Sequence, residues 1–158
     1  MGVFILLIIL GLVFMYAYAE YDEYVNASKN LQFNLSVLYY PHPLMYGDVF
    51  VFDIELVIYN PSSKDLTISD LSLSIYMEDY QITTLQRSQV YVRMREFTVL
   101  TEKLELKTSQ IARFFIDRPL TFRAVGTAHL RIRVLSIPVT ISIPIDIKYV
   151  SPVIVTLH

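Results

Sequence analysis

The ionisable side chains that could do chemistry are few and are poorly spaced for it. Three histidines, His42, His129 and His158, lie far apart and lack the short spacing of zinc ligands. Asp53 and Glu55 share one face of an expected strand at about 7 Å, a separation that glycoside hydrolases use. A catalytic pair also needs a cleft, and a solvated strand face is the simpler interpretation. We expect no metal site and no catalytic residue.

The composition removes several further kinds of site. The chain has no cysteine, which excludes disulfides, thiolate catalysis and cysteine-bound metals and suits a prokaryotic or archaeal source better than an animal secretory one. Only four glycines occur, and they are scattered, so no phosphate-cradling loop is present. No serine lies in a nucleophile-elbow motif. We therefore expect a protein that is not an enzyme and that holds no cofactor.

The distribution of charge is more informative than the net charge. The formal net charge of −2 argues against a nucleic-acid partner. Residues 1–86 carry ten acidic and two basic groups, whereas residues 87–158 carry five acidic and eleven basic groups. This asymmetry fits a bipolar surface, and it equally fits ion pairs between neighbouring strands, which we favour.

Two groups of side chains are candidates for interaction with a partner. The first is an aromatic, proline-bearing loop that includes Tyr39, Tyr40, His42 and Tyr46. The alternative for this loop is an ordered connector that plugs the core. The second group is basic and could contact anionic lipid headgroups or an acidic neighbour, with solvated cross-strand pairs as the alternative; its members include Arg93, Arg131 and Arg133.

The N-terminal segment carries the strongest localisation signal. Residues 1–19 contain an uncharged run, Val3 to Ala19, near the lower limit of about 17 residues for a membrane-spanning helix. Tyrosines near its end suit an aromatic belt. Ala17-Tyr18-Ala19 has the form of a signal-peptidase site, but no Lys or Arg precedes the run, and the run is long for a signal peptide. We expect a single-pass anchor, or else an uncleaved signal segment, with the rest of the chain on the extracytoplasmic side.

The residues after this run predict a short connection to a folded domain. Residues 20–30 are polar and rich in turn-forming residues, which is typical of a stalk. Asn26 and Asn34 each begin an Asn-X-Ser sequon and are possible glycosylation sites, in keeping with an exterior location.

Residues 31–150 predict an antiparallel β-sandwich of about seven strands, followed by a tail over residues 151–158. Alternating hydrophobic residues predict strands at Leu31–Tyr40, Asp48–Tyr59, Val90–Met94, Phe97–Leu106 and Ile137–Ile147, with a further strand ending at Val134. The alternation changes phase between Ile68 and Leu71, which predicts a β-bulge near Ser69-Asp70. Pro138 and Pro144 predict an edge strand, and a short helix is expected over Ser109–Asp117.

The segment from Ile54 to Ile68, centred on Asn60-Pro61, resembles a known hallmark. It is similar to the strand–Asn-Pro–strand motif of late-embryogenesis-abundant type 2 domains, also called water-stress-and-hypersensitive-response (WHy) domains. Residues 120–145 resemble the last hairpin of that family, although Leu135-Ser136 replaces the usual glycine in its loop. The resemblance spans residues 31–150 and implies an immunoglobulin-like sandwich without catalytic residues, in which Asn60 and Pro61 are structural.

Two functions are consistent with this sequence. The first is a membrane-anchored extracytoplasmic domain that protects the envelope under stress or that binds lipid or an envelope protein, as the resemblance implies. The second is a subunit of an extracellular assembly such as a pilus, an archaellum accessory or a surface-layer contact. In that case the protein would form a homo-oligomer, in which the apolar helix packs among copies of itself and the edge strand offers a site for strand addition.

Overall fold

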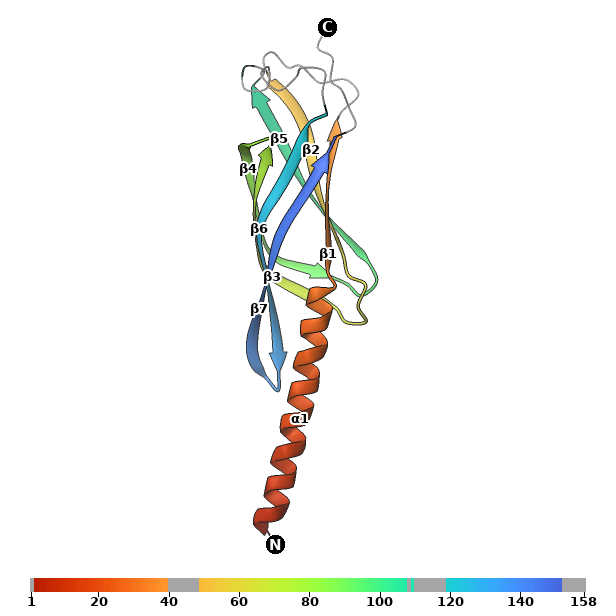
Figure 1. Cartoon of the computed structure of the whole chain (residues 1–158), viewed down its shortest axis with the longest axis vertical. Coiled ribbons are helices and arrows are strands. Elements are labelled where there is room, and N and C mark those ends of the chain that lie inside the picture. The colour runs from red at the N-terminus through yellow and green to blue at the C-terminus, as the bar shows by residue number, and fades with distance from the viewer. Residues whose placement is uncertain (1, 40–48, 108, 110–118, 152–158) are drawn as a thin grey trace.

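The computed structural model describes residues 2–39, 49–107, 109 and 119–151. A long N-terminal helix leads into a β-sandwich (Figure 1). The helix and the strands that the structure describes are α1 (Gly2–Lys29), β1 (Gln32–Tyr39), β2 (Val49–Tyr59), β3 (Leu66–Met77), β4 (Tyr80–Val92), β5 (Phe97–Lys107), β6 (Thr121–Val134) and β7 (Ile137–Val150). The expected class, mostly β with an N-terminal helix and about seven strands, is confirmed.

The strands form two antiparallel sheets of the immunoglobulin-like kind. One sheet has the order β1-β2-β5, and the other has the order β4-β3-β6-β7. In immunoglobulin constant domains the fourth strand pairs with the fifth strand, in the sheet that also holds the first two strands. Here β4 pairs with β3 instead, so the second sheet has four strands, and β7 forms one of its edges.

The core lies between the sheets, on the face where the strands bury alternate residues. In β2 the side chains of Phe52, Ile54, Leu56 and Ile58 are all at most 1% exposed, while the intervening residues face outward. Phe52 meets Phe122 of β6 edge to face, with ring centroids 5.9 Å apart, which joins the two sheets. The predicted inward face of this strand is therefore confirmed.

The predicted bulge in β3 is present. Ile68 pairs with Leu130 and Asp70 pairs with His129, so one extra residue, Ser69, stands in β3. The Ser69 hydroxyl donates to the His129 carbonyl at 2.9 Å. Burial changes phase at the same place, from Ile68 to Leu71. Beside the bulge, Gln89 of β4 has a φ of 55°, so the neighbouring strand is irregular as well.

Two expectations for local structure were wrong. The strand expected over Val90–Met94 is the end of β4, which begins at Tyr80. Its first half was missed because its side chains are mostly polar and only Leu85 is buried there. Residues 20–29 are not a turn-rich stalk, because α1 continues through them to Lys29. Packing against the domain stabilises this last part of the helix, where Ala27 and Ser28 are buried.

Several expectations fall outside the described residues. The short helix expected over Ser109–Asp117 lies outside them except for Ser109, which is helical. Of the expected tail over residues 151–158, only Ser151 is described.

The edge position predicted for Ile137–Ile147 is confirmed, since β7 pairs with β6 and ends its sheet. The β6–β7 turn, where glycine is missing, is closed by Leu135 and Ser136 with φ values of 47° and 68°. Positive φ at both positions is what a two-residue hairpin turn of type I′ requires.

Candidate functional site

The end of the domain that receives α1 holds most of the polar residues that the sequence singles out. β6 and β7 are the strands that α1 contacts most, and Figure 1 shows their hairpin running alongside the helix. Ala27 and Ser28 in the last turns of α1 are buried, as is Leu31 just after it. The helix is therefore packed onto the sandwich and is not joined to it by a loose linker.

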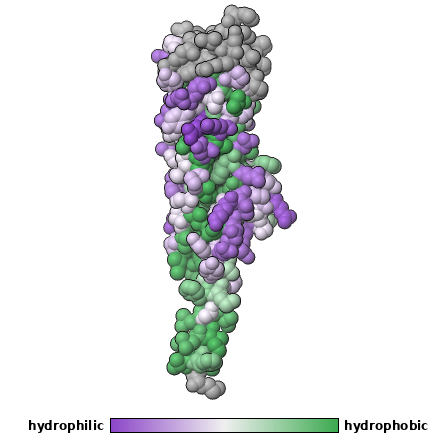
Figure 2. Space-filling view, in the orientation of Figure 1, coloured by the Kyte–Doolittle hydropathy of each residue, from purple (hydrophilic) through white to green (hydrophobic). Residues whose placement is uncertain are grey.

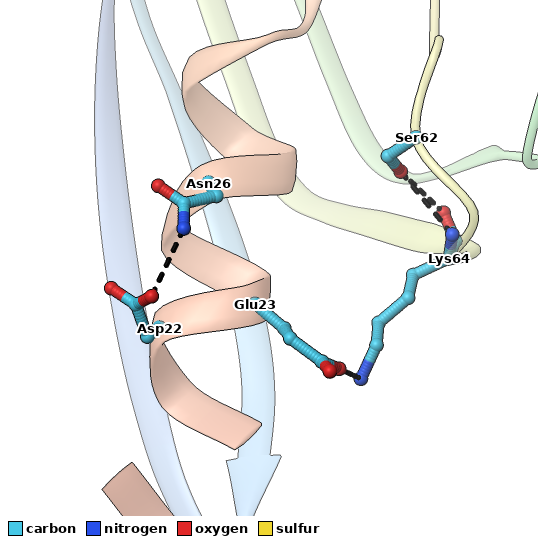
Figure 3. Close-up of polar contacts among 5 residues, drawn as sticks. All are labelled: Asp22, Glu23, Asn26, Ser62 and Lys64. Carbon is cyan, nitrogen blue, oxygen red and sulfur yellow. Dashed lines mark hydrogen bonds and ion pairs between the residues drawn. The ribbon is translucent and has the colours of Figure 1, made fainter. Parts of the chain in front are cut away.

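Lys64 fixes the helix to the turn between β2 and β3. Its ammonium group pairs with the carboxylate of Glu23 and lies 4.6 Å from the centre of the Tyr24 ring. Figure 3 shows Lys64 reaching from this turn to the side of the helix. The hydrogen bond to Glu23, followed by the charge of Glu23, raises the pKa of Lys64 against the opposing effect of burial. The ammonium form is thus favoured wherever the helix is docked.

Asn60 organises the turn that presents Lys64. Its side chain is fully buried. The Nδ2 group donates to the carbonyls of Lys64 at 2.8 Å and Val92 at 3.1 Å, and Oδ1 accepts from the backbone N–H and hydroxyl of Ser62. Its backbone also exchanges hydrogen bonds with the turn after β4, at Arg95 and Glu96. Asn60 therefore links the turn that carries Lys64 to the turn after β4.

Replacing Lys64 by alanine is expected to loosen the helix without unfolding the domain. The ion pair is partly exposed, so together with the ring contact it contributes about 1 kcal/mol or less. We expect a small loss of global stability but faster amide hydrogen exchange over residues 20–29. Because the pKa of Lys64 is raised on folding, its contribution is complete below the unfolded value of 10.5 and is lost as pH rises through the folded value.

Hydrogen exchange of the full chain in detergent micelles checks this expectation, with Lys103→Ala as a control. Lys103 lies on β5, where its exposed side chain pairs with Glu105 and is far from the helix contact of Lys64. Unchanged exchange over residues 20–29 in Lys64→Ala would show that Lys64 does not hold the helix.

Two of the three predicted arginines share one open groove on the outer face of the four-stranded sheet. The groove has a volume of about 660 Å³ and is lined by Thr67, Ser69, Gln89, Tyr91, Arg131 and Arg133. The groove lies at the bulge, where Ser69 of β3 and Gln89 of β4 are irregular. Both guanidinium groups are exposed, and neither forms an ion pair with another described residue. Such a surface can bind an anionic group.

Three other arginines lie next to acidic side chains instead of lining the groove. Arg93 does not line the groove; it lies in the turn after β4, 3.9 Å from Glu96. Arg87 bonds to Glu102 of β5 at 2.6 Å, and Arg123 makes a two-pronged contact with Asp146 of β7 at 2.7 and 2.5 Å. The hydrogen bond from Arg123 lowers the pKa of Asp146. Both pairs join residues of the same basic half of the sequence, 87–158. They do not link that half to the acidic residues 1–86, so these contacts do not support the favoured explanation of the charge asymmetry.

A second open cavity, of about 480 Å³, lies toward the other end of the same sheet. Its lining residues are Tyr76, Glu78, Asp79, Thr121, Arg123, Val125 and Lys148. Glu78 is engaged there, since its carboxylate accepts from the Thr121 backbone N–H at 3.0 Å. The described residues include no cluster of three or more His, Asp or Glu side chains suited to a metal ion.

The two sequons lie in different settings. Asn26 is exposed on α1 and donates to Asp22 at 3.0 Å (Figure 3), while Ser28 of the same sequon is buried and bonds to the Val25 carbonyl. Asn34 is exposed on β1. In the aromatic loop, Tyr39 is the last residue of β1, and Tyr40, His42 and Tyr46 lie outside the described residues.

Comparison with known proteins informs the fold only. No protein-family model matches the chain, and no curated protein is significantly similar to it. Solved structures that resemble it include a protein from Archaeoglobus fulgidus, with 11% identity over 78% of this chain and 99% of that one and a TM-score of 0.39. The putative ApaA protein from Bordetella pertussis has 17% identity over 78% and 94%, with a TM-score of 0.48. The structural-genomics target SoR45 has 11% identity over 83% and 94%, with a TM-score of 0.51. The similarity to this last structure indicates a shared β-sandwich, and at such low identity it extends no further than the fold.

Proposed function

We propose that this protein is a non-enzymatic, membrane-anchored β-sandwich that works on the extracytoplasmic face of a cell membrane, where it binds lipid or an envelope protein. The observation that carries the proposal is the state of α1. Its most apolar 18-residue window has a mean hydropathy of 2.3, and none of that window is buried against the protein. Figure 2 shows the hydrophobic surface of the helix standing clear of the domain. A bilayer is the environment that satisfies such a surface.

The junction between helix and domain supports an anchor over a cleaved leader. Residues 20–29 belong to the same helix as the apolar run, and Tyr24, Ala27 and Ser28 pack against the sandwich. Cleavage after Ala19 would leave a ten-residue helix without the segment that leads into it. An uncleaved helix docked in this way holds the domain close to the membrane surface.

The resemblance to late-embryogenesis-abundant type 2 domains supports a protective role under stress. In the turn that carries the resemblance, Asn60 is fully buried and its side chain is hydrogen-bonded through both Nδ2 and Oδ1. A protein of this kind acts through its surface and its location. A surface suited to this role is the groove on the outer face of the four-stranded sheet that holds Arg131 and Arg133.

A subunit of an extracellular assembly is the second candidate, because the same uncovered helix could pack among copies of itself. Side chains from Val3 to Tyr16 are exposed around the helix, as a helical filament core would also require. β7 offers an edge for strand addition in such an assembly.

Cysteine labelling of the full-length protein in cells tests the first proposal, since the chain has no cysteine of its own. Lys103→Cys, exposed on β5, is expected to react with a membrane-impermeant maleimide in intact cells. The membrane fraction is expected to resist carbonate extraction, and intact-mass analysis to find residues 1–19 retained. Labelling only after lysis, or loss of the segment, would refute the proposed anchor or its orientation. Ordered oligomers in mild detergent would favour the assembly.

A further inference from the structure

We infer that the tip of the β6–β7 hairpin is a second membrane contact, in which Leu135 and Ile137 enter the bilayer interface and Arg131 and Arg133 bind anionic lipid headgroups. This inference rests on the proposed membrane anchoring by α1. It adds a defined set of residues that touch the membrane and a chemical class of lipid that they recognise.

The hairpin projects beyond the rest of its sheet. β3 stops pairing with β6 at Leu130, whereas β6 and β7 remain paired to Val134 and Ile137. The projecting part is about 13 Å long at the usual rise of a strand. Figure 1 shows it pointing along α1 toward the helix N-terminus, which is the direction of the proposed membrane.

The exposure of residues along α1 shows how far one face of the helix is covered. Ala17, Glu20 and Tyr24 are half-buried, and their spacing of three and four residues places them on one face of α1. Residues on the remaining faces at this level, such as Tyr16 and Tyr18, are more than 60% exposed. Ala17 lies about 18 Å below Lys29 at the rise of an α-helix. It also lies inside the apolar run, so the half-buried face of the helix reaches the level where hydrocarbon begins.

The tip of the hairpin is built for an interface between water and lipid. Leu135 is 44% exposed and Ile137 is 64% exposed, an arrangement that water disfavours. On the face that Ile137 shares, Ile132 and Val134 are buried but lie outside the main core cluster. The tip therefore presents apolar side chains next to a helix that is itself apolar.

The opposite face of the hairpin is basic. Arg133 and Arg131 lie two and four residues before Leu135, with exposed side chains that form no ion pair among the described residues. Arginines just above buried apolar residues sit at headgroup height, and each basic residue near an anionic leaflet contributes attraction. Nearby Tyr91 and Gln89 complete the groove and offer further donors to a phosphate.

Fluorescence of the full-length protein reconstituted in vesicles tests this inference. A polarity-sensitive fluorophore is attached at Leu135→Cys or, as a matched control, at Lys148→Cys. Lys148 lies on the same hairpin, on an exposed face about 40 Å from the tip along the strand. We expect blue-shifted emission and strong quenching by spin-labelled lipid at position 135, and neither at position 148. Equal emission and quenching at the two positions would overturn the inference.

The lipid preference is tested with spin-labelled phosphatidylglycerol and phosphatidylcholine. Quenching at position 135 is expected to favour phosphatidylglycerol, by up to about fivefold for each arginine. Arg131→Gln with Arg133→Gln is expected to remove this preference, while Arg123→Gln on the same strand keeps it. A preference that survives the double substitution would overturn the role of these arginines. Resistance to carbonate extraction is measured in parallel: its loss would refute the anchor itself, whereas its retention with an unquenched tip would refute only the hairpin contact.

Discussion

Replacing Asn60 by aspartate is expected to destabilise the folded protein by about 3 kcal/mol or more at neutral pH. The new carboxylate has the shape of the amide but faces the carbonyls of Lys64 and Val92, which Nδ2 now bonds at 2.8 and 3.1 Å. Two hydrogen bonds become two repulsive contacts, and a charge is placed where the native side chain is fully buried. The backbone carbonyl of Asn60 also accepts a hydrogen bond from the Arg95 N–H. A shift of the backbone at residue 60 is therefore expected to loosen the turn after β4.

The dependence on pH distinguishes this cause from a general loss of packing. Burial beside two carbonyls raises the pKa of the introduced carboxyl above its unfolded value of about 3.9. The deficit is therefore complete above the folded pKa and shrinks as pH falls toward the unfolded pKa, because a protonated carboxyl can donate one bond. Asn60→Ala, which leaves the same partners unbonded without adding a charge, is expected to cost about 2 kcal/mol with little pH dependence.

Urea unfolding of the full chain in detergent measures these differences. Far-UV circular dichroism and tyrosine fluorescence suit the protein, which has twelve tyrosines and no tryptophan. If Asn60→Asp unfolded at the same urea concentration as the native chain, the buried network around Asn60 would not stabilise the fold as argued.

Replacing Gly126 by alanine is expected to cost about 2–3 kcal/mol through overpacking. Gly126 pairs with Leu73 in the middle of the four-stranded sheet. A Cβ at this position would lie 1.9 Å from the Ser72 carbonyl oxygen and 2.9 Å from the Leu73 Cα. Both are backbone atoms, so relief requires β3 and β6 to move apart, and no side-chain rotation can provide it.

Gly11→Ala supplies the matched control in the same unfolding measurement. A Cβ at Gly11 meets no atom within 4 Å, and alanine favours a helix over glycine by about 1 kcal/mol. We expect no destabilisation there. If Gly126→Ala were equally harmless, the close approach of β3 to β6 would not be a constraint on the fold.

Much of the fold is predictable because its signals are local. An uncharged apolar run predicts the helix, and alternation over Asp48–Tyr59 and Ile137–Ile147 predicts strands and their inward faces. The phase change between Ile68 and Leu71 predicts the bulge, since a single extra residue reverses which side chains are buried. The polar first half of β4 escaped because a strand with one buried residue has little alternation to detect.

Where α1 ends, and which residues hold it against the sandwich, were not predictable in the same way. Glu20 to Lys29 look like a linker by composition, and they are helical because Tyr24, Ala27 and Ser28 meet the sandwich. Lys64 is an ordinary turn residue in the sequence; its contact with Glu23 spans 41 positions and depends on how the helix meets the domain.

The sequence by itself determined that this chain carries an apolar helix, a β-sandwich, and no cysteine or metal-ligand spacing with which to do chemistry. It also placed Asn60-Pro61 in a turn and Arg131 and Arg133 on one strand face. Only the tertiary structure decided that these arginines join Thr67, Gln89 and Tyr91 in a groove on the outer face of the sheet, and that the hairpin runs along α1. The physical reason is that alternation and hydropathy act between near neighbours, whereas strand register and helix docking depend on contacts between segments far apart in the chain.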